Sequence, residues 1–129
     1  PVERLLAHEQ TVQKRVDDLV KVLQRERRIR LAIVADARTM VVLDGHHRLA
    51  ALRVLGCKRV PVLLVDYARP DIRVGTWREG EQPPTKDDVV KHASQGKLYP
   101  PKSTRHFFPW KLAEEPVPLD DLLRAEPAS

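Results

Sequence analysis

Val41-Val42-Leu43-Asp44-Gly45-His46-His47-Arg48 is the stretch around which the rest of the chain is organised. Its first three residues are β-branched or aliphatic and predict a buried strand, and leucines that recur every three residues from Leu49 predict a helix directly after it. The polar residues therefore lie at a strand-to-helix turn. Gly45 allows the backbone to turn sharply there, and the first N–H groups of the helix, at its positive dipole end, face any anion beyond the strand. The stretch predicts an anion-binding corner with the acid Asp44 beside it.

The chain before this turn predicts a short strand, a helix and a hairpin. Residues 1–7 contain three apolar residues and predict a strand that leads into a turn. Apolar residues at helical spacing over 12–23 predict an amphipathic helix, and its basic end at 25–30 is expected to be solvated rather than to contact nucleic acid. Residues 31–35 and 40–43 are two apolar runs joined by a polar tetrapeptide, which is typical of a hairpin.

The chain after the turn predicts two strands, a capped helix and an extended loop. Residues 60–65 form an apolar run that predicts a buried strand, in a candidate right-handed crossover with the strand and helix before it, and residues 72–77 predict one further strand. Thr85 begins a capping-box pattern that predicts a helix to about residue 95. Paired prolines hold residues 98–110 extended, with hydroxyls and cations between them.

Composition places the chain among globular proteins. Its 129 residues, 42% hydrophobic and 32% charged, predict a single domain over 1–129, with a core over about 1–110 and a partly irregular tail at 111–129. No run approaches the roughly 18 apolar residues of a membrane span, and the N-terminal residues lack a signal-peptide pattern, so we expect a cytoplasmic protein without membrane contacts. Cys57 is the only cysteine and is expected to be a small buried hydrophobe rather than a nucleophile or a zinc ligand.

Three segments far apart in the sequence carry residues suited to phosphoryl transfer. Glu9 follows the first predicted strand, Asp44 and the three bases after it lie at the turn, and Lys102 to His106 lie in the extended loop. If the segments converge, they combine carboxylates, cations and hydroxyls, which is what phosphoryl transfer uses. The formal charge of +5 suits a phosphate-bearing partner but does not separate DNA from a nucleotide. Taken alone, Glu9 could equally stabilise a helix dipole, and Lys102 and Arg105 could be surface charges.

The sequence gives little support to other kinds of site. The adjacent histidines at 46 and 47 point to different sides of the chain and make a poor pair of metal ligands. The familiar glycine-rich nucleotide loops are absent, and so is the serine-centred elbow of acyl transfer.

The segment from Val42 to Leu52, followed by a strand that ends at Tyr67, resembles the nuclease-like core shared by the ParB partition proteins and sulfiredoxin. Within that superfamily, the Asp-Gly-His-His-Arg motif, with His8-Glu9 before it and Pro101 to His106 after it, is similar to the free L-serine kinases. The resemblance covers about residues 1–110. It implies an α+β fold with a small mixed sheet flanked by helices, and an activity on the free amino acid with ADP or ATP as donor.

The resemblance also implies a role for each matching residue. Glu9 would accept the proton of the serine hydroxyl, and Asp44 would support the reacting centre or hold its Mg²⁺. The nucleotide phosphates would be bound by residues of the turn and of the loop, namely Gly45, His46, His47, Arg48, Lys102, Ser103 and Arg105. The serine would be bound by Trp77, Thr104, Arg105 and His106.

We therefore expect a cytoplasmic phosphotransferase that makes O-phospho-L-serine from free L-serine, with ATP or ADP as donor and Mg²⁺ as cofactor. The alternative is a non-catalytic ParB-like module that binds a nucleotide or DNA, which the net charge and the basic run at 25–30 favour. No helix-turn-helix follows the core, so DNA reading is disfavoured. Sulfinic acid reduction is not expected either, because His46 stands where the catalytic cysteine of sulfiredoxin would fall. Another small hydroxyl or amino-acid substrate, and any oligomeric state, remain open.

Overall fold

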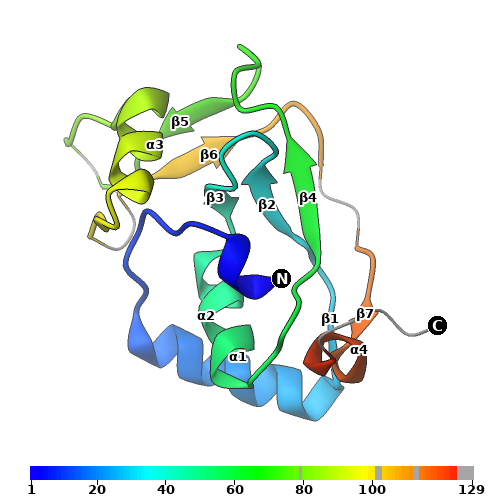
Figure 1. Ribbon diagram of the computed structural model, residues 1–129. Coiled ribbons are helices and arrows are strands. Elements are labelled where there is room, and N and C mark those ends of the chain that lie inside the picture. The colour runs from blue at the N-terminus through cyan, green and yellow to red at the C-terminus, as the bar shows by residue number, and fades with distance from the viewer. Residues whose placement is uncertain (79, 101–102, 112–113, 125–129) are drawn as a thin grey trace.

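The computed structural model describes residues 1–78, 80–100, 103–111 and 114–124 (Figure 1). The helical elements are the 3₁₀ turn η1 (Val2–Arg4) and the α-helices α1 (Gln13–Glu26), α2 (His46–Val54), α3 (Lys86–Ser94) and α4 (Leu119–Leu123). The strands are β1 (Arg28–Ile29), β2 (Ile33–Asp36), β3 (Val42–Asp44), β4 (Val62–Val65), β5 (Arg73–Gly75), β6 (Arg105–Phe107) and β7 (Val117–Pro118).

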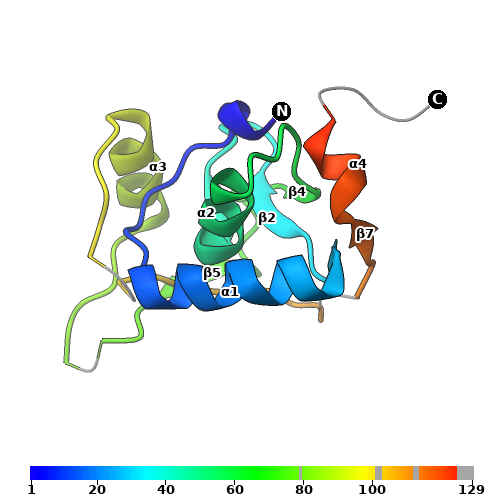
Figure 2. The same ribbon diagram turned by 90° about the horizontal axis from the view of Figure 1, so that it is seen from below.

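A three-stranded mixed sheet forms the centre of the molecule. Its strand order is β3-β2-β4, and β2 pairs antiparallel with β3 and parallel with β4. The pairs β5–β6 and β1–β7 form two further antiparallel ladders. The helix α1 lies along one side of the molecule, next to α2, and α3 and α4 lie at opposite ends (Figure 2). This arrangement is the predicted α+β fold with a small mixed sheet flanked by helices.

The central strand β2 is buried on both faces. Successive side chains of a strand point to opposite faces. Ile33 and Ala35 accordingly pack with the core cluster that includes residues of α1, α2 and α4, whereas Val34 packs with a second cluster that includes Tyr67 and Val89 of α3. The sequence shows continuous apolar runs here because both faces are covered.

Several predicted elements are confirmed. The hairpin is formed by β2 and β3, with a register shift between Val34 and Ala35. Thr85 caps α3: its hydroxyl accepts a hydrogen bond from the backbone N–H of Asp88, and the Asp88 carboxylate accepts one from the N–H of Thr85, both 3.1 Å long. Cys57 is buried, as expected of a small hydrophobe.

The predicted strand at residues 1–7 is wrong. The segment begins with the 3₁₀ turn η1, and Leu6 alone forms a bridge, with Val41. The spacing of Val2, Leu5 and Leu6 suits one helical turn followed by a bridge as well as it suits a strand.

The predicted buried strand and crossover at residues 60–65 also need correction. The strand β4 lies at an edge of the sheet, and its residues Leu63 and Leu64 are exposed. An apolar run does not distinguish a central strand from an edge strand, although Pro61 favours an edge. Because β4 is parallel to β2 and not to β3, the strand-helix-strand unit that begins at β3 is not a parallel crossover. No helix in the described ranges is long and apolar enough to cross a membrane.

Candidate active site

The turn between β3 and α2 has the backbone that the sequence predicts. Gly45 has a φ of 107°, so the backbone conformation favours glycine, and a Cβ added there would lie 2.9 Å from Nη2 of Arg48 and would displace the end of that side chain. The first N–H groups of an α-helix have no intrahelical acceptor, and within the described residues no side chain caps α2. These N–H groups are therefore available to an anion.

The imidazoles of His46 and His47 brace the N-terminal segment against this turn. Nε2 of His46 accepts a 3.2 Å hydrogen bond from the backbone N–H of His8, and Nε2 of His47 accepts a 3.1 Å bond from that of Val12. Burial lowers the pKa of His46 well below its usual value, with help from His8, and burial and Arg15 lower the pKa of His47. Both rings are neutral near pH 7, so an anion at this turn meets backbone N–H groups rather than imidazolium charges.

Asp44 and Arg48 form an ion pair beside the same turn. Nη2 of Arg48 lies 3.3 Å from Oδ2 of Asp44 and donates a 3.2 Å hydrogen bond to the carbonyl of Ala32. The Asp44 side chain is 48% exposed and that of Arg48 is 20% exposed. The carboxylate at the end of β3 is thus held by one cation and still open to solvent.

Glu9 and Thr104 bring the first and last predicted segments together. Oε1 of Glu9 accepts two hydrogen bonds from Thr104, one of 2.8 Å from the backbone N–H and one of 2.9 Å from the hydroxyl. Nε2 of His8 lies 2.9 Å from the same hydroxyl oxygen. The acid that precedes α1 is therefore held by a buried threonine just before β6.

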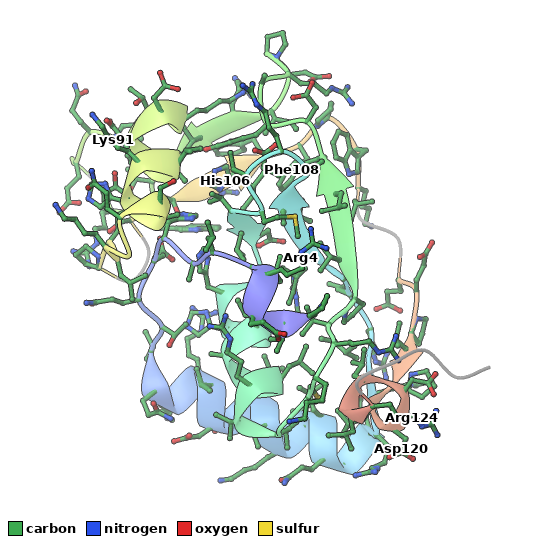
Figure 3. The ribbon with its side chains drawn as sticks, viewed as in Figure 1. Arg4, Lys91, His106, Phe108, Asp120 and Arg124 are labelled. Atoms are coloured by element: carbon green, nitrogen blue, oxygen red, sulfur yellow. The ribbon has the colours of Figure 1, made fainter. Side chains whose placement is uncertain are left out.

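His106 occupies the interior next to this group. Its Nε2 lies 2.8 Å from the hydroxyl of Tyr67, and its ring centroid is 5.8 Å from that of His8. Figure 3 shows His106 among the strands, whereas Lys91 and Arg124 lie at the periphery. Burial, together with His46, lowers the pKa of His106 to about 4. His106 is a neutral, inward-facing residue of the predicted serine-binding set.

Arg105 lies between two aromatic rings. Its guanidinium carbon is 3.9 Å from the ring centroid of Trp77 and 4.7 Å from that of Phe107. Trp77 is 58% exposed. In the described part of the chain no carboxylate pairs with Arg105, so its N–H donors are available to a ligand.

The structure brings most of the predicted residues to one cleft of about 850 Å³. The predicted residues that line it are Glu9, Asp44, Gly45, His46, His47, Arg48, Trp77, Thr104, Arg105 and His106. Ser103 does not line it: this residue is buried and donates a 2.6 Å hydrogen bond to the carbonyl of Pro100. Lys102 lies outside the described residues.

The rest of the cleft lining comes from residues that the sequence did not indicate. They are mostly apolar and charged side chains of α1 and the segment after it, namely Arg15, Leu19, Val22, Leu23, Glu26, Arg28, Ile29, Arg30 and Leu31. The amphipathic pattern of α1 was visible, but it does not say whether an apolar residue packs in the core or lines a cleft. The basic run at 25–30, expected to be solvated, supplies Arg28 and Arg30 to the cleft.

The described residues contain no cluster of three or more His, Cys, Asp or Glu side chains that could hold a metal ion. Asp44 alone offers a half-exposed carboxylate at the cleft, beside the turn. Mg²⁺ is commonly held by one or two carboxylates together with substrate phosphates and water, so this donor set fits a Mg²⁺ that arrives with a nucleotide.

Sequence relatives of the chain include two kinases. An ATP-dependent L-serine kinase of Staphylothermus marinus is 32% identical over 119 residues, and an ADP-dependent L-serine kinase of Thermococcus kodakarensis is 34% identical over 80 residues. A ParB-like protein of Sulfolobus acidocaldarius is 31% identical over 75 residues. These matches cover 74%, 59% and 58% of this chain and 47%, 33% and 37% of those proteins, so the chain spans half or less of their length. No protein-family model matches the chain.

The fold is shared with a solved kinase. Free serine kinase in complex with AMP superposes with a TM-score of 0.87 at 19% identity, over 94% of this chain and 91% of that one. The fold and the strand-to-helix turn thus define a ParB-like α+β protein. Within that class, the chain is similar in sequence to L-serine kinases and shares its fold with a solved free serine kinase.

Proposed function

We propose that this chain transfers a phosphoryl group from ATP or ADP to the hydroxyl of free L-serine and so makes O-phospho-L-serine. The observation that carries the proposal is that the Glu9 carboxylate, held by Thr104, opens to the same cleft as the uncapped N-terminus of α2. A base and an anion site in one cleft are the parts that phosphoryl transfer to an alcohol needs. The serine kinases among the sequence relatives support the choice of acceptor.

Glu9 acts as the general base. Its Oε1 is occupied by the two donors of Thr104, whereas Oε2 has no partner among the described residues. A serine hydroxyl that donates to this free oxygen loses its proton to Glu9 as the oxygen attacks the terminal phosphorus in line and the nucleotide leaves on the opposite side.

The developing negative charge is met by groups of the turn and of β6. The N–H groups at the start of α2 bind phosphate oxygens, with the helix dipole favouring the anion. Arg105, stacked on Trp77, offers planar donors to a phosphate or to the serine carboxylate. These donors are in place before the reaction and need no reorganisation.

Asp44 is the residue that would hold Mg²⁺ in this site. When bound, the ion supplies positive charge that neutralises the phosphate oxygens. The ion pair with Arg48 holds the Asp44 carboxylate beside the turn that follows β3.

The part of the cleft formed by α1 and the segment after it suits the base of the nucleotide. Leu19, Val22 and Leu31 offer apolar surface, and Arg28 and Arg30 also line the cleft. A nucleotide with its phosphates at α2 would extend along α1.

The direct test is phosphoserine formation by purified protein with L-serine and Mg²⁺, measured by mass spectrometry, with ATP and ADP in separate reactions. Product in one reaction identifies the activity and the donor. Parallel reactions with threonine and homoserine test the third possibility, a different small hydroxyl substrate. Absence of product from every acceptor would contradict the proposal.

A non-catalytic nucleotide- or DNA-binding module is the second candidate, because five arginines line the cleft, namely Arg15, Arg28, Arg30, Arg48 and Arg105. Retention on duplex DNA separates the two proposals. A DNA-binding module loses affinity steeply as salt is raised, while the kinase proposal expects no retention at physiological salt.

A further inference from the structure

His8 connects all three segments of the cleft, although the catalytic proposal gives it no task. It is fully buried and directly precedes Glu9. Its backbone N–H donates to Nε2 of His46, its carbonyl accepts a 2.8 Å hydrogen bond from the N–H of Tyr99, and its own Nε2 lies 2.9 Å from Oγ1 of Thr104. A buried side chain with these contacts is held in one orientation.

The contacts of Thr104 fix the direction of the hydrogen bonds. A hydroxyl has one proton to donate. The Thr104 hydroxyl donates that proton to Oε1 of Glu9, so toward His8 the same oxygen acts as an acceptor. His8 must then carry its proton on Nε2. Its Nδ1 has no hydrogen-bond partner among the described residues, so no hydrogen bond at Nδ1 opposes this assignment.

We propose that His8 is a positioning residue that donates Nε2–H to the Thr104 hydroxyl and thereby commits the hydroxyl proton to Oε1 of Glu9. This inference rests on the proposed function, in which Glu9 is the base. Two donors then hold one oxygen of the carboxylate, and Oε2 is left as the oxygen that takes the serine proton. Thr104 acts on the reaction through Glu9.

The environment of His8 keeps this arrangement unchanged over the working pH range. Burial and the neighbouring His106 lower the pKa of His8 to about 3, against a smaller opposite effect of the Val42 carbonyl and a further lowering by His92. A neutral ring has a single N–H, so the directions of the hydrogen bonds from His8 to Thr104 and from Thr104 to Glu9 do not change between pH 5 and pH 8.

A double-mutant cycle tests the coupling. His8→Leu removes the donor, Thr104→Val removes the hydroxyl, and each is expected to lower kcat about tenfold, with little change in the KM for nucleotide. In the Thr104→Val background, His8→Leu should have no further effect, because the group through which it acts is gone. His8→Gln, which places an amide N–H near the position of Nε2, should restore most of the activity. Independent, multiplying effects in the double variant, or no rescue by glutamine, would overturn the inference.

The tautomer itself is measured on the wild-type protein by long-range ¹H–¹⁵N correlation of its histidines. We expect the proton of His8 on Nε2, and those of His46 and His47 on Nδ1, because the last two accept at Nε2. A proton on Nδ1 of His8 would turn the Thr104 hydroxyl toward His8 and would overturn the inference. If the wild type makes no phosphoserine while His8 shows the Nε2–H form, the proposed function fails and the hydrogen-bond arrangement stands.

Discussion

The carboxylate of Glu9 accepts a 2.9 Å hydrogen bond from the hydroxyl of Thr104, although 95 positions separate the two residues in the sequence. Neither residue is distinctive on its own. Their pairing joins the segment before α1 to β6 and directs an acid into the cleft that also receives the N-terminus of α2. The first prediction concerns this acid.

Replacing Glu9 with glutamine should abolish base catalysis and spare binding. Glutamine keeps an oxygen that can accept from Thr104 but does not take up the serine proton, so we expect turnover to fall by about 10²–10⁴-fold. Nucleotide affinity, measured by titration calorimetry, should stay within twofold. Glu3→Gln, in the exposed part of η1, is the matched control and should retain wild-type turnover. Wild-type turnover in Glu9→Gln would remove Glu9 as the base.

The sequence predicted the turn for identifiable reasons, whereas only the resemblance of the motifs implied that the three segments converge. An apolar run that ends in Asp44 and Gly45 and precedes helically spaced leucines predicts a strand-to-helix turn. The capping box at Thr85, which is confirmed, is likewise specified by residues close together in the sequence. The edge position of β4 was only partly predictable: Pro61 favours an edge or a first position, but edge and central strands can carry the same apolar residues.

The roles of the turn histidines could not be predicted from the sequence either. His46 and His47 lie in a motif that favours phosphate binding, but their ring nitrogens accept backbone N–H groups of the segment around Glu9. That pairing depends on a segment 38 positions away, in the case of His46, and leaves no local pattern. The anion site is therefore expected in the backbone of the turn, which leads to the next prediction.

Gly45→Ala should damage both the fold and nucleotide binding. The new Cβ meets Arg48 at 2.9 Å and the residue must keep a φ of 107°, whereas Gly56→Ala carries a positive φ of 78° with no atom within 4 Å. We expect Gly56→Ala to lower the free energy of unfolding by about 1 kcal/mol with unchanged nucleotide affinity. Gly45→Ala should lower the free energy of unfolding by more than about 1 kcal/mol and should also bind nucleotide less tightly. Urea denaturation measures the loss of stability, and titration calorimetry measures the loss of nucleotide affinity. Equal losses of unfolding free energy in the two variants would contradict the expected effect of the contact with Arg48.

The stability of the protein should fall as the pH is lowered from about 6.5 to about 4. The pKa of His106 is lowered to about 4 by burial first and by His46 second, and that of His8 is lowered to about 3, against an unfolded value near 6.5. Between these values the unfolded chain binds more protons than the folded one, so the free energy of unfolding rises with pH and is constant above the unfolded pKa.

His106→Gln tests this dependence. Removing one depressed histidine should reduce the slope of the unfolding free energy by about 1.4 kcal/mol per pH unit between pH 4.5 and pH 6. Urea denaturation at several pH values measures the slope. Ser94→Ala, on α3 and outside the cleft, changes no histidine and is the control that should keep the wild-type slope. The same slope in His106→Gln and wild type would show that folding does not lower the pKa of His106.

Arg105→Lys should weaken substrate binding despite the conserved charge. The planar guanidinium stacks on Trp77 at 3.9 Å and presents its donors as a fork, which an ammonium group does not reproduce. We expect the KM for serine or nucleotide to rise about tenfold, consistent with the loss of one charge-assisted hydrogen bond. Arg73→Lys, on the neighbouring strand β5 over Phe107, is the control outside the cleft. Unchanged KM values for both substrates would place Arg105 outside the binding site.

Arg15→Gln should weaken nucleotide binding in a salt-dependent way. Arg15 lies on the first turns of α1, lines the cleft and is close enough to His47 for its charge to lower the pKa of that residue. A cation at this position attracts the nucleotide phosphates over a distance at which salt screens the attraction. Titration calorimetry at low and high salt should therefore show a several-fold loss of affinity that shrinks as salt is added, while the pKa of His47, followed by NMR, should rise.

Arg25→Gln removes the same charge from an exposed position of α1 that does not line the cleft, so it should change neither quantity. If Arg15→Gln raises the pKa of His47 but leaves nucleotide affinity unchanged at low salt, the phosphates do not lie at the start of α2, and their proposed position is wrong.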